Sequence, residues 1–330
     1  MIDGRVVQDF RKRVEAELRG NILPFWLKHS IDEEFGGFRG RISNALEIDP
    51  RAEKGLILNA RILWTFSHAY RILGEEVHQR TAERAKEYLM ASFWDREYGG
   101  FFWMVDCHGL PLDTRKKTYG QAFGVYALAE HFLASGNKES LRRAHQLYAL
   151  ILKSSYDGSR GGYFETCERD WSLARDQRLS EVDLDEKKSM NTHLHMLEAS
   201  SALFRASRDG AVRDRLRELV HLFLDYIIDP GNFHFRMFFD EDWRPRSDRL
   251  SFGHDIEGSW LLCEAADLLD DRDLVVRINE TAVKMAAAVL NQAVDGDGGL
   301  LYEADPGGII DDDKHWWPQA EAVVGFINAY

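Results

Sequence analysis

The sequence has 330 residues, of which 45% are hydrophobic and 29% are charged, a composition typical of globular proteins with a large core. Its formal net charge of −13 at pH 7 has the wrong sign for a phosphate-binding surface, and no Lys/Arg-rich run interrupts it. We therefore expect no nucleic-acid partner.

The N-terminal segment from Met1 to Phe10 lacks the apolar stretch of a signal peptide. No apolar run approaches the roughly 20 residues that a membrane-spanning helix needs. The three cysteines, Cys107, Cys167 and Cys263, are too far apart in sequence for a zinc site or a redox pair. We expect reduced thiols, a cytoplasmic location and no membrane partner, whereas the oligomeric state is left open.

An internal repeat starts near the N-terminus. An aspartate followed by Gly-Gly and an aromatic residue occurs at Asp32–Phe38, Asp95–Phe101 and Asp157–Tyr163, and a variant occurs at Asp295–Leu300. A degenerate copy is expected within Gly231–Trp243, which gives five related units. Because glycine adopts backbone angles that other residues avoid, we interpret the motif as a loop-shaping turn rather than as a carrier of chemistry.

Two kinds of helical segment alternate between these turns. One kind is amphipathic, with apolar residues spaced three and four apart, and predicts outer helices. The other kind is apolar or small nearly all round, and predicts inner helices buried on every side. The predicted outer helices are Glu76–Phe93, Glu139–Ser154, Arg213–Ile228 and Arg272–Leu290. The predicted inner helices are Gly55–Leu73, Tyr119–Leu133, Ser189–Ala206 and Asp255–Leu269.

Each turn joins an outer helix to an inner one, so every inner helix is expected to begin at the same end of the molecule. Hairpins repeated in this way predict an all-α fold, the (α/α)6 toroid, with residues 1–330 as a single domain. The fifth inner helix begins at Trp317, and the sequence ends at Tyr330. We therefore expect the last hairpin to be incomplete in this chain.

Polar residues in apolar inner helices are costly unless they have partners, so they are informative. Taken singly, each such residue is better explained as a hydrogen-bonded polar group of the core than as part of a functional site. Five helices that contribute polar residues at the same end favour a site instead. The candidate residues are Arg61, Tyr119, Asn191, His195, His254, Glu257, Trp317 and Glu321.

His254 lies at a predicted helix N-terminus, where the helix dipole keeps an imidazole neutral and so suited to act as a general base. Glu257, one turn later, is expected to orient the ring, although a capping histidine beside a surface glutamate explains the same pattern. The adjacent Trp316 and Trp317 suit stacking against the apolar faces of sugar rings, Trp317 more than Trp316.

Other chemistries have no support in the sequence. The motifs His-Glu-x-x-His and Gly-x-Ser-x-Gly and a phosphate-binding glycine loop do not occur. His193 and His195 are two residues apart on a helix and face different ways, which makes a poor metal pair. We expect neither a metal nor a cofactor.

Three segments carry a family resemblance: Lys188–Glu198, Ser251–Leu262 and Lys314–Glu321. They closely resemble the cellobiose 2-epimerase branch of the N-acylglucosamine 2-epimerase superfamily, and the likeness runs over essentially the whole chain. The resemblance implies an (α/α)6 barrel. It also implies reversible inversion at C2 of the reducing-end sugar of β-1,4-linked disaccharides such as cellobiose, lactose or mannobiose.

The resemblance also implies residue roles. His254 resembles one of two histidines that exchange the C2 proton, with Glu257 in support, and His195 resembles a histidine that assists ring opening. The second proton-exchanging histidine of the family lies beyond the end of this sequence, so we expect this chain to be poorly active. The residues expected to bind substrate are Arg61, Tyr119, Asn191, Trp317 and Glu321.

Three alternatives remain at this point. An N-acylglucosamine 2-epimerase or a mannose-type aldose–ketose isomerase shares the first proton abstraction. An inverting glycoside hydrolase needs two carboxylic acids, for which Asp255 and Glu257 are candidates. A non-catalytic sugar- or partner-binding protein needs no reactive group.

Overall fold

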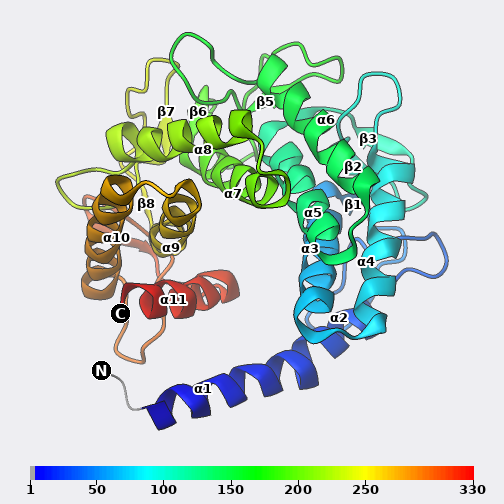
Figure 1. The fold of residues 1–330 in the computed structure, drawn as a ribbon, viewed down its shortest axis with the longest axis horizontal. Helices are drawn as coiled ribbons and strands as arrows, with labels where there is room; N and C mark the ends of the chain where they lie inside the picture. Colours follow the sequence, from blue (N-terminus) through cyan, green and yellow to red (C-terminus); the bar gives the residue numbers. More distant parts are fainter. Residues whose placement is uncertain (1–3) are drawn as a thin grey trace.

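Inner helices packed side by side form the centre of the molecule. The computed structural model describes residues 4–330, and Figure 1 shows these helices following one another around a ring. Each packs against the next in chain order. The inner helices are α3 (Leu56–Leu73), α5 (Thr118–Ser135), α7 (Met190–Ser207), α9 (Phe252–Leu269) and α11 (Trp316–Ala329). The prediction of the inner helices is therefore confirmed, with starts shifted by one to three residues.

Outer helices cover this ring, as the amphipathic patterns predict. In the second and fourth units the outer helix ends in a π-helical turn. The single outer helix predicted for each of these units is therefore an α-helix followed by a π-helical turn. The outer helices are α4 (Glu76–Tyr88) with η2 (Leu89–Phe93), α6 (Lys138–Ser154), α8 (Gly210–Leu222) with η3 (Phe223–Ile227), and α10 (Arg272–Gln292).

The first turn is preceded by helices that the sequence did not predict. They are α1 (Gly4–Glu17), the π-helical turn η1 (Leu18–Ile22) and α2 (Leu23–His29). No residue of α1 is buried, although its sequence is amphipathic like those of the outer helices. It lies before the first turn, so the alternation of helices between turns did not include it. Within residues 4–330 the series of inner helices ends at α11, and α1 extends along the side of the ring between α11 and α3 (Figure 1).

All five turns are closed by the same kind of bridge, including the degenerate copy, although the fifth turn is one residue shorter. In each, the residue before the aspartate forms an antiparallel bridge with the last residue of the motif. In the fourth unit this bridge joins Ile228 to Phe235, so the turn begins at Asp229. Phe233 there has φ 62°, a left-handed angle that Gly36 adopts at the equivalent place in the first unit. This substitution is why the sequence motif is hard to see.

A lysine placed just before the inner helix is a second element of the repeat. Its Nζ binds the aspartate that opens the turn, and in three units both groups are almost completely buried. The fourth unit has Leu250 in place of the lysine. The pairs are Lys54–Asp32 (2.8 Å), Lys116–Asp95 (3.2 Å), Lys188–Asp157 (2.9 Å) and Lys314–Asp295 (2.7 Å).

Short antiparallel strands tie neighbouring units together. The strand before an inner helix pairs with a strand that follows the next unit's turn, in the orders β1-β2-β3, β4-β5, β6-β7 and β10-β9-β8. The strands are β1 (Lys54–Gly55), β2 (Met104–Val105), β3 (Pro111–Asp113), β4 (Lys116–Lys117), β5 (Thr166–Cys167), β6 (Lys188–Ser189), β7 (Phe238–Phe239), β8 (Leu250–Ser251), β9 (Glu303–Asp305) and β10 (Gly308–Asp311). This pairing places the starts of all the inner helices at the same end of the barrel that the helices form.

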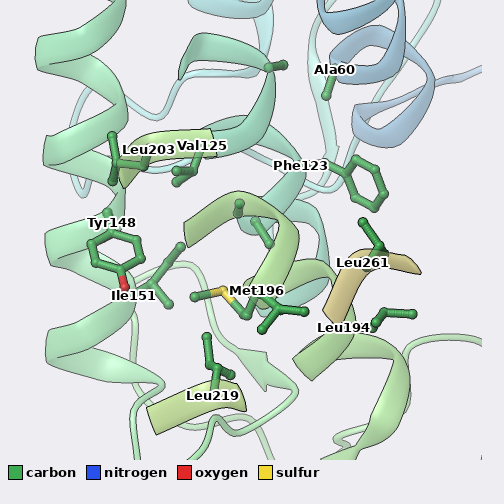
Figure 2. Packing of buried hydrophobic residues seen from close by; sticks show 14 of the residues in the cluster. Ala60, Phe123, Val125, Tyr148, Ile151, Leu194, Met196, Leu203, Leu219 and Leu261 are labelled. Atoms are coloured by element: carbon green, nitrogen blue, oxygen red, sulfur yellow. The ribbon is translucent and has the colours of Figure 1, made fainter. Parts of the chain in front are cut away.

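The main core fills the space between inner and outer helices. Figure 2 shows Met196 of α7 among Tyr148 and Ile151 of α6 and Leu219 of α8, all buried. The three cysteines are buried and unbridged, as expected for reduced thiols. A search of residues 4–330 finds no helix with the length and hydropathy needed to cross a bilayer.

Candidate active site

The repeat gives each inner helix the same set of positions. The fifth residue after the lysine, or after Leu250 in the fourth unit, accepts a hydrogen bond from the backbone N–H that closes the turn in four units. We call these four residues the turn-fastening residues. The bonds join Gln121 to Phe101 N (2.8 Å), His193 to Tyr163 N (2.9 Å), Asp255 to Phe235 N (2.7 Å) and Gln319 to Leu300 N (2.8 Å).

Asp255 is fully occupied in this role. Its Oδ1 accepts the Phe235 N–H at 2.7 Å, and its Oδ2 lies 2.7 Å from Nδ1 of His234. Both side chains of the pair are almost completely buried. Asp255 is therefore a structural group, and the pair of carboxylic acids that a glycoside hydrolase needs is not formed by Asp255 and Glu257.

Two positions further along, the helices carry residues that come together around the middle of the ring. We call these the inward residues. The guanidinium of Arg61 lies 4.4 Å from the centre of the Phe123 ring, and that ring lies 4.6 Å from the ring of His195. The inward residues are Arg61, Phe123, His195, Glu257 and Glu321.

His195 is held by a neighbour on its own helix. Its Nδ1 lies 3.0 Å from Oε2 of Glu198, and the ring meets Tyr119 edge-on at 5.0 Å. Burial lowers the pKa of His195, although Glu198 opposes the shift. Because a carboxylate accepts the hydrogen bond, the neutral ring carries its proton on Nδ1 and leaves Nε2 as the acceptor.

The inward residues of three helices form an electrostatic cluster. Burial opposes the charge of Arg61, but Tyr119, Glu198 and Glu257 outweigh it and raise the pKa of the guanidinium. Burial raises the pKa of Glu257 well above its ordinary value, and the carboxylates of Glu321 and Glu198 add to the rise. A carboxyl group in this setting tends to keep its proton and can donate it to an oxygen.

Glu321 has a similar environment. Burial raises its pKa, while a 2.9 Å hydrogen bond from Trp260 Nε1 opposes the rise. Glu321 is thus a buried carboxyl group hydrogen-bonded to Trp260 and close to Glu257 and Arg61.

His254 is the third residue of α9, at the predicted helix N-terminus. Burial lowers its pKa to about 3, with a smaller contribution from His195, so the ring is neutral at pH 7. We expected Glu257 to orient this ring. The hydrogen-bond partner is instead Ser251, whose Oγ lies 2.7 Å from Nδ1, while Glu257 lies among the charges of Arg61, Glu198 and Glu321.

A cavity of about 340 Å³ opens beside His254. Asn191, at the start of α7, also lines it, and the buried Oδ1 of Asn191 has no hydrogen-bond partner among residues 4–330. A buried acceptor without a partner is a place where a ligand donor can bind. Trp317 packs against His254 with ring centres 4.8 Å apart, whereas Trp316 is 79% exposed.

The structure thus divides the candidate residues between two places, the cavity and the cluster in the ring. Asn191 and His254 line the cavity, with Trp317 behind His254. The remaining five candidates, Arg61, Tyr119, His195, Glu257 and Glu321, form the cluster in the ring. Two functional neighbours were missed, Glu198 and Ser251. Each stands three residues from its histidine, a helical spacing that signals contact.

Comparison with known proteins identifies the family. A sequence profile of the N-acylglucosamine 2-epimerase (GlcNAc 2-epimerase) family matches residues 36–330. Over 321 residues the chain is 46% identical to the cellobiose 2-epimerase of Bacteroides fragilis, which covers 97% of this chain and 82% of that protein.

Solved structures give the same result. The cellobiose 2-epimerase of Bacillus thermoamylovorans B4167 superposes with a TM-score of 0.94 at 38% identity, covering 98% of this chain and 82% of that one. A D-mannose isomerase, at 24% identity and a TM-score of 0.79, covers 93% of this chain and 77% of its own and shares the fold. The predicted all-α (α/α)6 barrel class is confirmed. The chain therefore belongs to the N-acylglucosamine 2-epimerase family and is an epimerase or isomerase.

Proposed function

We propose that this protein inverts C2 of the reducing-end sugar of β-1,4-linked disaccharides such as cellobiose, lactose and mannobiose. The similarity in sequence and structure to cellobiose 2-epimerases over nearly the whole chain supports this substrate class. The observation that carries the mechanism is a neutral, buried imidazole, His254, which lines a cavity and lies close enough to His195 of the ring cluster for that ring to lower its pKa.

His254 takes the proton from C2 of the open-chain sugar. The C2–H bond breaks, its electron pair forms the C1–C2 double bond of an enediolate, and the negative charge collects on O1. A neutral histidine is the form that can accept this proton. If His254 returns the proton to the same face, the starting sugar is restored. Inversion requires a second acid that delivers a proton to the opposite face of C2.

The residues of the cluster in the ring stabilise the charge that develops in this reaction and bind the sugar oxygens. Arg61 stays protonated and stabilises the enediolate oxygen, and Tyr119 helps to hold the sugar oxygens. His195, with Nε2 as acceptor, assists opening of the pyranose ring. Asn191 binds a sugar hydroxyl through its unpartnered Oδ1, and Trp317 provides an aromatic surface.

Deuterium exchange separates the two halves of the reaction. In D₂O, exchange at C2 requires only proton removal by His254, whereas epimer formation also requires delivery of a proton to the other face. Both are measured by NMR on cellobiose in a single sample. We expect His254→Ala to slow exchange by about 10²–10⁴-fold, the usual loss when a general base is removed.

The control is His221→Ala, which removes an exposed histidine from the outer helix α8. It should leave exchange unchanged. Exchange at the normal rate in His254→Ala would remove His254 from the mechanism.

A comparison of substrates tests the alternative functions. We expect exchange with cellobiose to exceed exchange with free mannose and with N-acetylmannosamine. Preference for mannose, with a ketose as product, favours an aldose–ketose isomerase, in which the proton returns to C1. Calorimetric binding of cellobiose without any exchange favours a sugar-binding protein.

A further inference from the structure

The inner helices begin at equivalent residues, so their first positions can be compared directly. Two of the five N-cap residues are serines, Ser189 of α7 and Ser251 of α9. Their backbones are both extended, with φ −125° and −121°. The five N-cap residues are Gly55, Lys117, Ser189, Ser251 and His315.

The two serines make different hydrogen bonds. The Oγ of Ser189 accepts the backbone N–H of Thr192 at 3.1 Å, which is the ordinary role of a serine at a helix start. Ser251 makes no such bond to its own helix. Its Oγ instead lies 2.7 Å from the imidazole Nδ1 of His254, the residue equivalent to Thr192.

Packing holds the same ring from another direction. Trp317 lies 4.8 Å from the His254 ring, tilted by 58°. Gly253 provides the space for this contact, because a Cβ atom on it would lie 2.6 Å from Cη2 of Trp317. The His254 ring therefore has one polar anchor, Ser251, and one apolar neighbour, Trp317.

We propose that Ser251 is a positioning residue that accepts the Nδ1 proton of His254 and so keeps Nε2 as the proton-accepting atom in the cavity. A neutral imidazole carries one proton, and the hydrogen bond made by one nitrogen sets the role of the other. The serine gives up its capping bond to its own helix in this arrangement. This inference rests on the proposed role of His254 and adds the residue that sets its tautomer.

The test reads the tautomer independently of turnover. In ¹⁵N-labelled full-length protein, NMR shifts of the His254 ring nitrogens should show a single neutral form protonated on Nδ1. In Ser251→Ala the two tautomers should become mixed. C2 exchange should fall by about 10–100-fold, the range seen when a histidine of a metal site loses its orienting partner. The loss should lie in kcat rather than KM.

Two variants serve as controls. Ser251→Thr keeps the hydroxyl and should restore both the single tautomer and the exchange rate. Ser189→Ala removes the matching serine of α7 and should leave the His254 resonances unchanged. A wild-type His254 protonated on Nε2, or a tautomer that does not change in Ser251→Ala, overturns the inference. A mixed tautomer with normal exchange supports the positioning role of Ser251 and contradicts the proposed role of His254.

Discussion

The turn-fastening residues and the inward residues lie only two positions apart on the same inner helices but differ in role. The first hold the turns in place, and the second lie in the candidate site. On α7, His193 accepts the Tyr163 N–H and its Nδ1 lies 2.7 Å from the Ser189 carbonyl oxygen, so both its nitrogens are used by the scaffold. His195 uses Nδ1 for Glu198 and keeps Nε2. The helical step of about 100° per residue turns the two rings to different sides of the helix. Residue type alone therefore does not reveal which histidine is reactive.

The acidic residues of α9 repeat this division. Asp255 fastens a turn and is paired with His234, whereas Glu257 lies among the inward residues near Arg61. A repeat of this kind separates stability from chemistry. Substitutions in the scaffold should change the free energy of unfolding, and substitutions among the inward residues should change turnover.

The buried lysine of the scaffold should give the largest effect on stability. Nζ of Lys188 binds Asp157 at 2.9 Å and the carbonyl oxygens of Gly161 and Glu241 at the same distance. Lys188→Met leaves the Asp157 carboxylate buried without its cation, which typically costs about 3–5 kcal/mol. Urea denaturation measures this loss.

Lys314→Met is the matched control, because Lys314 occupies the same repeat position and binds Asp295. Its side chain is 30% exposed and its two carboxylate partners are half exposed or more, so we expect a much smaller loss than for Lys188→Met. Equal losses in the two variants would show that burial does not set the strength of the repeated ion pair.

The repeat and the inner helices could be predicted because their signals are local. Glycine pairs mark the turns, and helices that are apolar all round mark burial. The partner of His254 could not be predicted, because Ser251 and Glu257 both stand one turn from it. The choice depends on charges that other helices bring near Glu257, which the local spacing does not contain.

The first helices were missed for a different reason. Helix α1 is amphipathic in sequence, but it lies before the first turn and so outside the alternation of outer and inner helices from which the others were predicted. The fourth turn was placed only approximately, because Phe233 adopts the left-handed angle that glycine adopts elsewhere.

Substitutions of His193 and His195 on α7 should have opposite effects on stability and on turnover. His193→Ala leaves the buried N–H of Tyr163 without an acceptor, and we expect a loss of about 1–3 kcal/mol in the free energy of unfolding. C2 exchange per folded molecule should stay near the wild-type rate. His195→Ala should slow exchange with a smaller change in stability. The reverse pattern would contradict the division between scaffold and inward residues.

The stability of the protein should also depend on pH through its buried histidines. Burial lowers the pKa of both His193 and His254 from the ordinary 6.5 to about 3. Above pH 6.5 these rings are neutral in both states, so their contribution is fully present. Below pH 6.5 each of these histidines is protonated in the unfolded chain, whereas in the folded protein it stays neutral down to about pH 3. Each histidine therefore lowers the free energy of unfolding by about 1.4 kcal/mol per pH unit as the pH falls.

Other groups also contribute to the profile, so variants must isolate each ring. Burial raises the pKa of Glu165 to about 8, which acts in the opposite direction between about pH 4.5 and 8. His193→Gln and His254→Gln should each flatten the pH dependence below pH 6.5 by that same slope, because glutamine does not titrate. Urea denaturation between pH 4.5 and 7.5 measures this. Since the two rings sit on different helices and have no common hydrogen-bond partner, the double variant should show the sum. A slope that His254→Gln leaves unchanged would mean that the cavity admits enough water to let His254 titrate normally, and His254 would then no longer be held neutral by burial.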